Sequence, residues 1–211
     1  MSIKAVIFDM GGVLVRTEDR GPRTALGLRF DKTYREFDEA VFGAPTSRQA
    51  SVGEISTQAH MRALMRSFGL PETDAAIKEF RDQFFAGDVV DKEMVKEIDA
   101  LRPQFTTAIL SNAWDDLRGF LEDTWQIAYA FDEIFISAEM GVVKPDPKIY
   151  EMVLEALKLK PEEAVFVDDF LHNIEAARKL GMHGIHFQSK AQAMGELKEL
   201  LHSQNAYHEN P

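Results

Sequence analysis

The 211-residue sequence contains no cysteine. This absence excludes a disulfide scaffold, a zinc–thiolate site, an iron–sulfur cluster and a cysteine nucleophile. No stretch approaches the roughly 18 consecutive apolar residues of a bilayer-spanning helix. The first residues lead directly into a strand-like segment, without a signal-peptide pattern. From these absences we expect a cytoplasmic protein that has no membrane partner.

Positive charge is scarce. The chain has 24 Lys and Arg against 35 Asp and Glu, a formal net charge of −11. This excess of acid argues against a nucleic-acid groove or an anionic membrane surface as the main partner. A site for an anionic substrate must therefore supply its own local positive charge. With 45% hydrophobic residues, the composition is that of a globular protein with a large core, as one domain or as one domain with an insertion.

Short apolar runs alternate with helical patterns over much of the chain. Nearly continuous apolar character is typical of strands covered on both faces of a parallel sheet. Asp146-Pro147 is a good helix start, and Gly181 is a good helix end. The alternation predicts a doubly wound, Rossmann-like α/β core with right-handed crossovers. The predicted strands are Ile3–Phe8, Phe105–Leu110, Glu133–Ser137, Ala164–Val167 and His183–Phe187.

One long segment breaks this alternation. No convincing strand is seen between Phe8 and Phe105, and the segment is too long to be a loop in a compact domain. We expect a helical cap subdomain at residues 16–87, inserted into a core of residues 1–15 and 88–211. The polar tail from His202 to Pro211 is expected to fray. The amphipathic stripes in the insertion are Tyr34–Phe42, Gln58–Phe68 and Asp74–Phe85, separated by breaks at Gly43-Ala44-Pro45 and Gly69-Leu70-Pro71.

Polar residues follow the predicted strands, where the ligand site of an open parallel sheet lies. Taken alone, each of them is more simply a turn, a helix cap or a surface residue. Their position at the same end of several strands predicts that they converge at one site. They are Asp9, Gly11 and Gly12 after the first strand, Ser111 and Asn112 after the second, Lys144 beyond the third, and Asp168, Asp169 and Asn173 after the fourth.

The charges of these residues indicate a cation. Three carboxylates and one ammonium would leave a partly dry cleft with a charge of about −2. A donor set made only of oxygen atoms suits a hard ion, and Mg²⁺ would neutralise the site. Backbone amides around Gly11 and Gly12, the Ser111 hydroxyl and Lys144 would then cradle a phosphoryl group. Asp9 is placed to attack phosphorus and form an aspartyl-phosphate.

The sequence resembles the haloacid dehalogenase-like hydrolase superfamily from Ile3 to about Gln188. Its four motifs occur in order, and the stretches around Ser111 and Lys144 are especially similar to the phosphatase domain of soluble epoxide hydrolases and to bacterial sugar-phosphate phosphatases. The motifs read Val6-Ile7-Phe8-Asp9-Met10-Gly11-Gly12-Val13, Ile109-Leu110-Ser111-Asn112, Val143-Lys144-Pro145 and Val165-Phe166-Val167-Asp168-Asp169 with Asn173.

The resemblance implies a role for each site residue. Asp9 would be the nucleophile and a Mg²⁺ ligand, together with Asp169 and the backbone carbonyl of Gly11, and Asp168 would hold the water around the metal. Lys144 would counter the charge of Asp9. The phosphoryl group would be bound by Ser111 and Lys144, together with the backbone of Gly11 and Gly12. Asn112 would either bind the substrate as well or support the groups that do. Asn173 would support these groups.

One position departs from the family pattern. Most phosphatases that the sequence resembles have Asp-x-Asp in the first motif, where the second Asp exchanges protons with the leaving group and with water. Here that position is Gly11, as it is in some of the resembling phosphatases. An acid–base group typically contributes 10²–10⁴-fold to the rate. Glu18, Asp19 and His172 lie within chain reach as substitutes.

These observations predict a Mg²⁺-dependent phosphatase that acts on a small phosphorylated metabolite. One alternative is a metal-independent dehalogenase on the same scaffold; another is a catalytically weak protein that binds phosphate or a partner. The substrate would depend on cap residues near Arg48 and Glu54. The sequence does not predict the substrate's identity or the oligomeric state.

Overall fold

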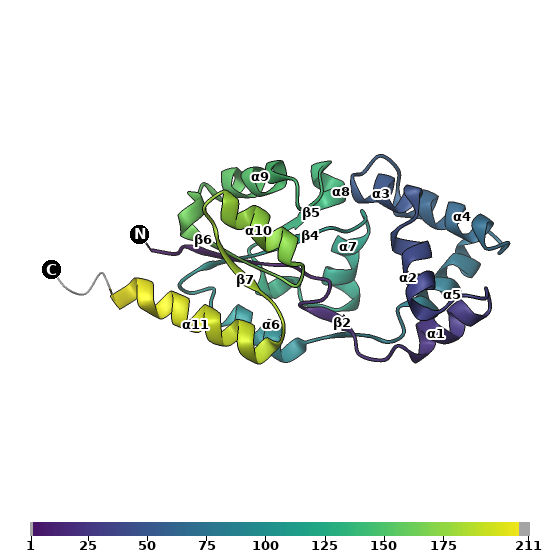
Figure 1. Cartoon of the computed structure of the whole chain (residues 1–211), viewed down its shortest axis with the longest axis horizontal. Helices are drawn as coiled ribbons and strands as arrows, with labels where there is room; N and C mark the ends of the chain where they lie inside the picture. The colour runs from purple at the N-terminus through teal and green to yellow at the C-terminus, as the bar shows by residue number, and fades with distance from the viewer. Residues whose placement is uncertain (1, 207–211) are drawn as a thin grey trace.

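The computed structural model describes residues 2–206, and a five-stranded parallel sheet forms its centre (Figure 1). The strand order is β5-β4-β1-β6-β7, so the first strand of the chain lies in the middle. This architecture confirms the predicted doubly wound α/β fold, and the predicted strands differ from the observed ones only at their ends. The strands are β1 (Ala5–Phe8), β4 (Thr106–Ser111), β5 (Glu133–Ile136), β6 (Ala164–Asp168) and β7 (His183–His186).

Helices cover both faces of this sheet. On one face, alternate residues of β1 and β6, such as Val6 and Val165, pack against α6 (Lys92–Asp99) and α11 (Lys190–Ala206). On the other face, Ile7 and Phe166 pack against α9 (Pro147–Leu157) and α10 (Leu171–Lys179). Every residue of β1 and β6 is buried, because each strand faces helices on both sides.

Local signals set the ends of the helices that flank the site. Asp146 accepts a hydrogen bond from the backbone N–H of Lys148, which caps α9 as expected. Gly181 has a φ of +97°, a left-handed conformation that favours glycine just beyond the end of α10. The remaining short helical turns of the core are α7 (Leu117–Gly119), α8 (Ser137–Met140) and the segments Phe120–Thr124, Ala128–Ala130 and Pro161–Glu163.

The segment between the first two sheet strands contains a cluster of helices with an apolar core of its own (Figure 1). The three predicted helices are present, but α1 and α3 were missed. Pro45, which we read as part of a break, instead occupies the first turn of α3, where its missing N–H costs nothing. The helices are α1 (Gly21–Leu28), α2 (Tyr34–Phe42), α3 (Pro45–Ser51), α4 (Thr57–Ser67) and α5 (Asp74–Phe84).

Two strands join this helical cluster to the sheet half, so the expectation that no strand lies between Phe8 and Phe105 is wrong. β2 (Val15–Thr17) and β3 (Asp88–Val90) pair antiparallel. The Thr17 hydroxyl donates a hydrogen bond of 2.6 Å to Asp88, and the buried Arg23 binds the same carboxylate. The strands are three residues long and only partly buried, so they lack the apolar run on which strand prediction depends.

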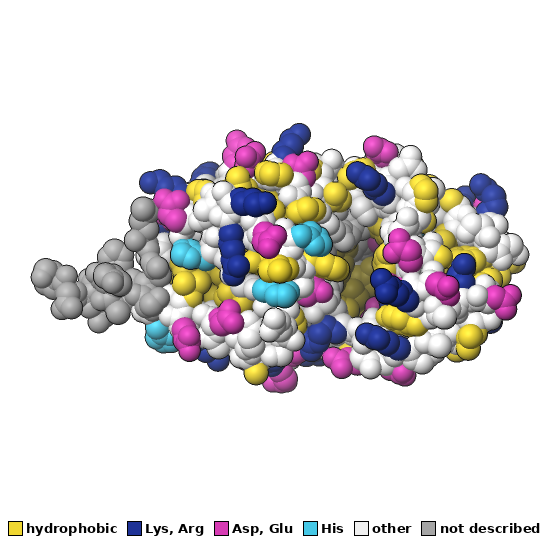
Figure 2. All heavy atoms as spheres, viewed as in Figure 1, with side chains coloured by type: hydrophobic (Ala, Val, Ile, Leu, Met, Phe, Trp, Pro, Cys, Tyr) yellow, Lys and Arg dark blue, Asp and Glu magenta, His cyan; other side chains and the backbone are white. Residues whose placement is uncertain are grey.

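A second connection runs from the end of β4 into the helical cluster. Trp114 is buried among the apolar side chains of the helices and stacks on Phe42, at 5.7 Å between ring centroids. Asp115 accepts a hydrogen bond from the backbone N–H of Thr57, at the start of α4. Figure 2 shows a furrow between the sheet half and the helical half. The furrow therefore lies between two parts joined by two strands and by the segment after β4.

The C-terminal helix is longer than expected. α11 continues to Ala206, so residues 202–206 of the predicted frayed tail are helical, and residues 207–211 lie outside the described residues. Within residues 2–206, no helix is both long and apolar enough to cross a bilayer.

Candidate active site

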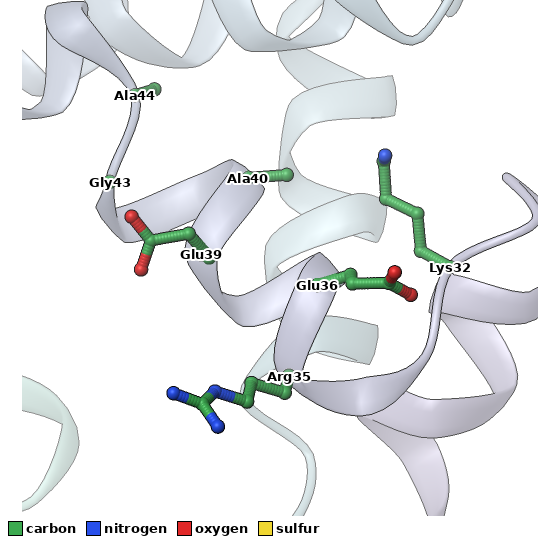
Figure 3. A pocket seen from close by; sticks show the side chains of 7 residues that line it. All are labelled: Lys32, Arg35, Glu36, Glu39, Ala40, Gly43 and Ala44. Carbon is green, nitrogen blue, oxygen red and sulfur yellow. The ribbon is translucent and has the colours of Figure 1, made fainter.

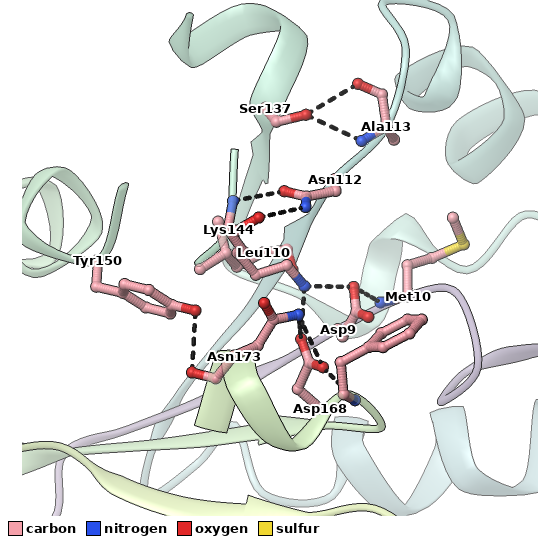
Figure 4. Close-up of polar contacts among 11 residues, drawn as sticks. Asp9, Met10, Leu110, Asn112, Ala113, Ser137, Lys144, Tyr150, Asp168 and Asn173 are labelled. Carbon is pink, nitrogen blue, oxygen red and sulfur yellow. Dashed lines mark hydrogen bonds and ion pairs between the residues drawn. The ribbon is translucent and has the colours of Figure 1, made fainter. Parts of the chain in front are cut away.

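The carboxyl ends of the central strands bring the predicted charged groups together (Figure 4). Asp9 directly follows β1, and Asp168 is the last residue of β6. Lys144 lies on the loop between α8 and α9 and reaches both carboxylates. All three side chains are almost completely buried. The site is thus a buried ionic cluster at the edge of the sheet.

Lys144 lies at the centre of the cluster, and all three of its ammonium protons have partners. Its Nζ lies 2.8 Å from Oδ1 of Asp9 and 2.7 Å from Oδ2 of Asp168. The third partner is the backbone carbonyl of Leu110, at 2.9 Å. The ammonium therefore neutralises Asp9 and Asp168 directly, and contact with a phosphoryl oxygen would require it to exchange one of these bonds.

One carboxylate oxygen of Asp9 is bound by protein groups, and the other is free. Oδ1 accepts hydrogen bonds from Lys144 and from the backbone N–H of Met10, at 2.8 Å. Oδ2 makes no hydrogen bond among the described residues, which leaves it available as a nucleophile or a metal ligand. Burial raises the pKa of Asp9 from its ordinary 3.8 to about 7; Lys144 opposes this rise, and the neighbouring Asp168 adds to it.

Asp168 is fully engaged by protein groups. Its Oδ1 accepts a hydrogen bond of 2.7 Å from the backbone N–H of Phe170, and the Asn173 side-chain amide lies 3.0–3.1 Å from both oxygens. Asn173 is held in turn by Tyr150, whose buried hydroxyl donates to its backbone carbonyl. With its oxygens occupied, Asp168 is suited to organising the site rather than to binding a ligand directly.

Asp169 is the least satisfied group of the cluster. Its Oδ1 is buried and makes no hydrogen bond among the described residues, although His186 binds its backbone carbonyl at 3.0 Å. Burial raises the pKa of Asp169, and the charge of Asp168 adds to the effect. One oxygen each from Asp9, Asp168 and Asp169 lie within 4.8 Å of one another. An orphaned oxygen in an all-oxygen donor set fits a hard cation such as Mg²⁺.

The two glycines after Asp9 differ in their surroundings. Gly12 has a φ of +79°, and a Cβ built on it would lie 2.2 Å from Oδ2 of Asp169. Glycine at this position therefore lets the first loop approach the Asp169 carboxylate. A Cβ built on Gly11 would meet no atom within 4 Å, and its φ is not in the left-handed region. Of these two glycines, only Gly11 has room for a side chain.

Ser111 and Asn112 have different environments, although they are adjacent. The buried Ser111 hydroxyl makes no hydrogen bond among the described residues, so it remains available to a ligand. Asn112 is exposed, and its amide binds the backbone N–H and the carbonyl of Lys144, at 2.8 and 2.9 Å. No local sequence pattern indicates this contact, because it depends on the path of the loop that carries Lys144.

The candidate acid–base substitutes make no hydrogen bond or ion pair with the cluster among the described residues. Glu18 pairs with Arg16, and Asp19 accepts a hydrogen bond from the backbone N–H of Gly21. The exposed His172 packs on the ring of Phe170. None of the three has a contact with Asp9 in the described part of the chain, so the position of Gly11 has no evident replacement.

The helical half has an open hollow of about 640 Å³ on α2, apart from the acidic cluster (Figure 3). Arg35 and Glu39 extend to the same side of the helix in this view. Arg48 and Glu54, which we expected near the substrate, are exposed but do not line this hollow. Its lining residues are Lys32, Arg35, Glu36, Glu39, Ala40, Gly43 and Ala44.

The chain is similar to known hydrolases and phosphatases. The bifunctional epoxide hydrolase 2 of Rattus norvegicus is 31% identical over 97% of this chain, which spans only 40% of that relative. The sesquiterpene phosphatase astK of Aspergillus oryzae is 32% identical over 95% of this chain and 97% of its own length. The chain spans about 40% of the length of the first curated relatives it matches.

A solved structure shares the fold. It is a haloacid dehalogenase family enzyme from Bacteroides thetaiotaomicron, in complex with magnesium and inorganic phosphate. The TM-score is 0.73, with 24% identity over 90% of this chain and 96% of that one. The family model for haloacid dehalogenase-like hydrolases matches residues 3–181. Since that match spans most of the sequence, this chain belongs to the haloacid dehalogenase-like hydrolases.

Proposed function

We propose that this hydrolase is a Mg²⁺-dependent phosphatase that acts on a small phosphorylated metabolite through an aspartyl-phosphate intermediate. The observation that carries the proposal is the cluster of Asp9, Asp168 and Asp169, which offers ligand oxygens within 4.8 Å of one another and includes an Asp169 oxygen without a partner, next to Lys144. The phosphatase relative from Aspergillus oryzae and the magnesium–phosphate complex of the Bacteroides enzyme support it.

In this mechanism Oδ2 of Asp9 attacks phosphorus, and the bond from phosphorus to the leaving oxygen breaks. Lys144 holds Oδ1 and neutralises the adjacent carboxylate, which opposes the rise in the pKa of Asp9 and favours the ionised form that attacks. Water then hydrolyses the aspartyl-phosphate and releases phosphate. Bound Mg²⁺, held by Asp9, Asp169 and the Gly11 carbonyl, would neutralise charge on the phosphoryl oxygens. The Ser111 hydroxyl and the backbone amides of Gly11 and Gly12 would bind those oxygens.

We also propose a functional division of the chain. Residues 1–15 and 88–211 would form the catalytic core, and residues 16–87 would form a cap over the site. The separate apolar cluster of α1–α5 and the furrow in Figure 2 support this division. We propose that the cap selects the group that carries the phosphate.

The test is release of phosphate from p-nitrophenyl phosphate, with Mg²⁺ and with EDTA. Mg²⁺-dependent release supports the proposal. Halide release from a 2-haloacid without metal would favour a dehalogenase instead. Binding of phosphate without turnover of a panel of sugar, nucleotide, prenyl and organic-acid phosphates would favour a non-catalytic protein.

Mg²⁺ is expected to stabilise the protein more at pH 8 than at pH 5.5. Because the pKa of Asp9 is raised from 3.8 to about 7, the metal-free folded state holds a proton that the unfolded state has lost. Because of Asp9, the free energy of unfolding of the metal-free protein therefore falls as pH rises from about 4 to 7. Above pH 7 a cation meets an ionised carboxylate, whereas at pH 5.5 it must displace the proton. Thermal unfolding with and without Mg²⁺ measures the difference, and an equal shift at both pH values would contradict it.

Asp169→Asn is expected to weaken Mg²⁺ binding more than Asp168→Asn does. Asp169 has the orphaned oxygen, whereas the Asp168 oxygens are already bound by Lys144, Asn173 and a backbone N–H. Loss of a supporting group typically costs 10–100-fold in metal affinity, and we expect a larger loss for Asp169. Titration of activity against Mg²⁺ ranks the two variants, and the opposite order would exchange their roles.

Gly11→Asp is expected to fold normally and to raise turnover of alkyl phosphates, whose leaving oxygen needs a proton. Turnover of p-nitrophenyl phosphate should change little, because its leaving group needs almost none. The open space at Gly11 permits the side chain. Gly12→Asp is the matched control, and its collision with Asp169 should lower both rates. If Gly11→Asp lowered both rates equally, Gly11 would be a backbone requirement and not a vacant acid–base position.

A further inference from the structure

The end of β4 holds Lys144 at two separate points (Figure 4). The carbonyl of Leu110 accepts a hydrogen bond of 2.9 Å from the Lys144 ammonium. Two residues later, the Asn112 side chain binds the Lys144 backbone, accepting from its N–H at 2.8 Å and donating to its carbonyl at 2.9 Å. The end of β4 therefore holds both the backbone and the ammonium group of Lys144.

Asn112 is itself held in place. The next residue, Ala113, donates its backbone N–H to the Ser137 hydroxyl at 3.0 Å, and that hydroxyl donates to the Ala113 carbonyl at 3.2 Å. Ser137 is completely buried. Beyond Ala113, the buried Trp114 anchors the segment in the helical half. Asn112 thus projects from a backbone fixed on both sides, although its own side chain is exposed.

The position of Lys144 has consequences for the whole cluster. Its ammonium lies 2.7–2.8 Å from two carboxylates that are themselves almost completely buried. Charge-assisted hydrogen bonds of this kind depend steeply on geometry, and a displacement of about 1 Å in a reacting group can cost about 100-fold in rate. The two Asn112 bonds are the contacts that hold the Lys144 backbone to the neighbouring strand.

We propose that the side chain of Asn112 positions Lys144 and does not bind substrate. Both functional atoms of its amide are used on the Lys144 backbone, so neither is left for a phosphoryl oxygen in this arrangement. Asn112 acts by fixing the ammonium that keeps Asp9 oriented and neutralised. The expected effect on turnover rests on the phosphatase function proposed above.

The kinetic test compares Asn112→Ala and Asn112→Asp with the parent protein, on p-nitrophenyl phosphate with saturating Mg²⁺. Asn112→Ala removes both bonds, and we expect kcat to fall by roughly 10–100-fold, the range for loss of a supporting group, with KM nearly unchanged. Asn112→Asp keeps an acceptor for the Lys144 N–H, so it should lose less. Gln104→Ala, which removes another exposed amide, is the control. A raised KM with unchanged kcat would overturn the proposal in favour of substrate binding.

A second measurement does not depend on activity. Acetic anhydride labelling, followed by mass spectrometry, reports how accessible each lysine is. Lys144 should be protected in the parent protein, whereas the exposed Lys148 provides an internal reference on the same segment. We expect labelling of Lys144 relative to Lys148 to rise several-fold in Asn112→Ala and less in Asn112→Asp.

The two measurements separate two kinds of failure. If the parent protein released no phosphate but Lys144 became labelled in the variants, the phosphatase proposal would fail and the positioning role would stand. If labelling of Lys144 did not change in either variant, the positioning role would be wrong whatever the activity. Should Asn112→Ala fail to fold, Asn112→Asp decides the outcome by the same ratio.

Discussion

Asp9→Asn is expected to reduce phosphate release by roughly 10⁴-fold or more, the order seen when a catalytic nucleophile is removed. The amide keeps the shape of the carboxylate but removes the free oxygen that would attack phosphorus. It also removes one negative charge from the proposed metal site. The measurement is kcat on p-nitrophenyl phosphate, with circular dichroism as the check on folding.

Asp31→Asn, a change of the same type at an exposed position of the helical half, is the control and should retain full activity. The variant also separates nucleophilic from purely ionic roles. If Asp9→Asn kept more than about a hundredth of the parent rate, Asp9 would not be the nucleophile. Trapping of a phosphorylated peptide containing Asp9 in the parent, but not in the variant, would identify the intermediate directly.

After Asp9→Asn, we expect the next largest effect from Lys144→Ala, which should lower both the free energy of unfolding and the activity. It leaves the buried carboxylates of Asp9 and Asp168 without their shared counter-charge, and it leaves the Leu110 carbonyl without its donor. Breaking a buried ion pair by removing one partner typically costs about 3–5 kcal/mol. Asp9 should take up a proton more readily, because Lys144 no longer opposes the rise in its pKa. The loss of stability should therefore be larger at pH 8 than at pH 5.

The activity of Lys144→Ala should fall by at least about 100-fold in kcat/KM, since removal of a group that stabilises developing charge costs this much or more. Extra Mg²⁺ should not restore it, because the ammonium binds Asp9 Oδ1 and Asp168, whereas the cation would use the free oxygens of Asp9 and Asp169. Lys148→Ala is the exposed control. Complete recovery at high Mg²⁺ would show that Lys144 supplies only general positive charge.

The parts of the fold that follow from local pattern were predictable. β1 and β6 are continuous apolar runs because both of their faces are buried. Asp146 is a residue type that begins a helix, and Gly181 is one that ends a helix. β2 and β3 were missed because a three-residue ribbon has no detectable period. α3 was missed because a proline can either break a helix or begin one.

The charged residues of the site were predictable because parallel strands end at the same edge of the sheet. Their individual tasks were not. Asn112 and Asp168 are polar residues at the ends of strands, and only the contacts show that both side chains are occupied by protein partners. The difference between Gly11 and Gly12 likewise depends on φ and on the approach of Asp169, which are set by tertiary structure. Trp114 completes an apolar cluster distant in sequence, and no local pattern marks this role.

β1 lies in the centre of the sheet, and it is synthesised long before the strands that pair with it. β1 leaves the ribosome before the other strands of its sheet, and its partners are β4, where Ala5 pairs with Thr106, and β6, where Ala5 pairs with Ala164. The helical segment emerges next, and its apolar cluster still lacks Trp114. Because chains are synthesised at about 5–20 residues per second, at least about 5 seconds separate the synthesis of β1 from that of its first partner, β4. The apolar strand β1 therefore lacks its second neighbour until β6 has emerged.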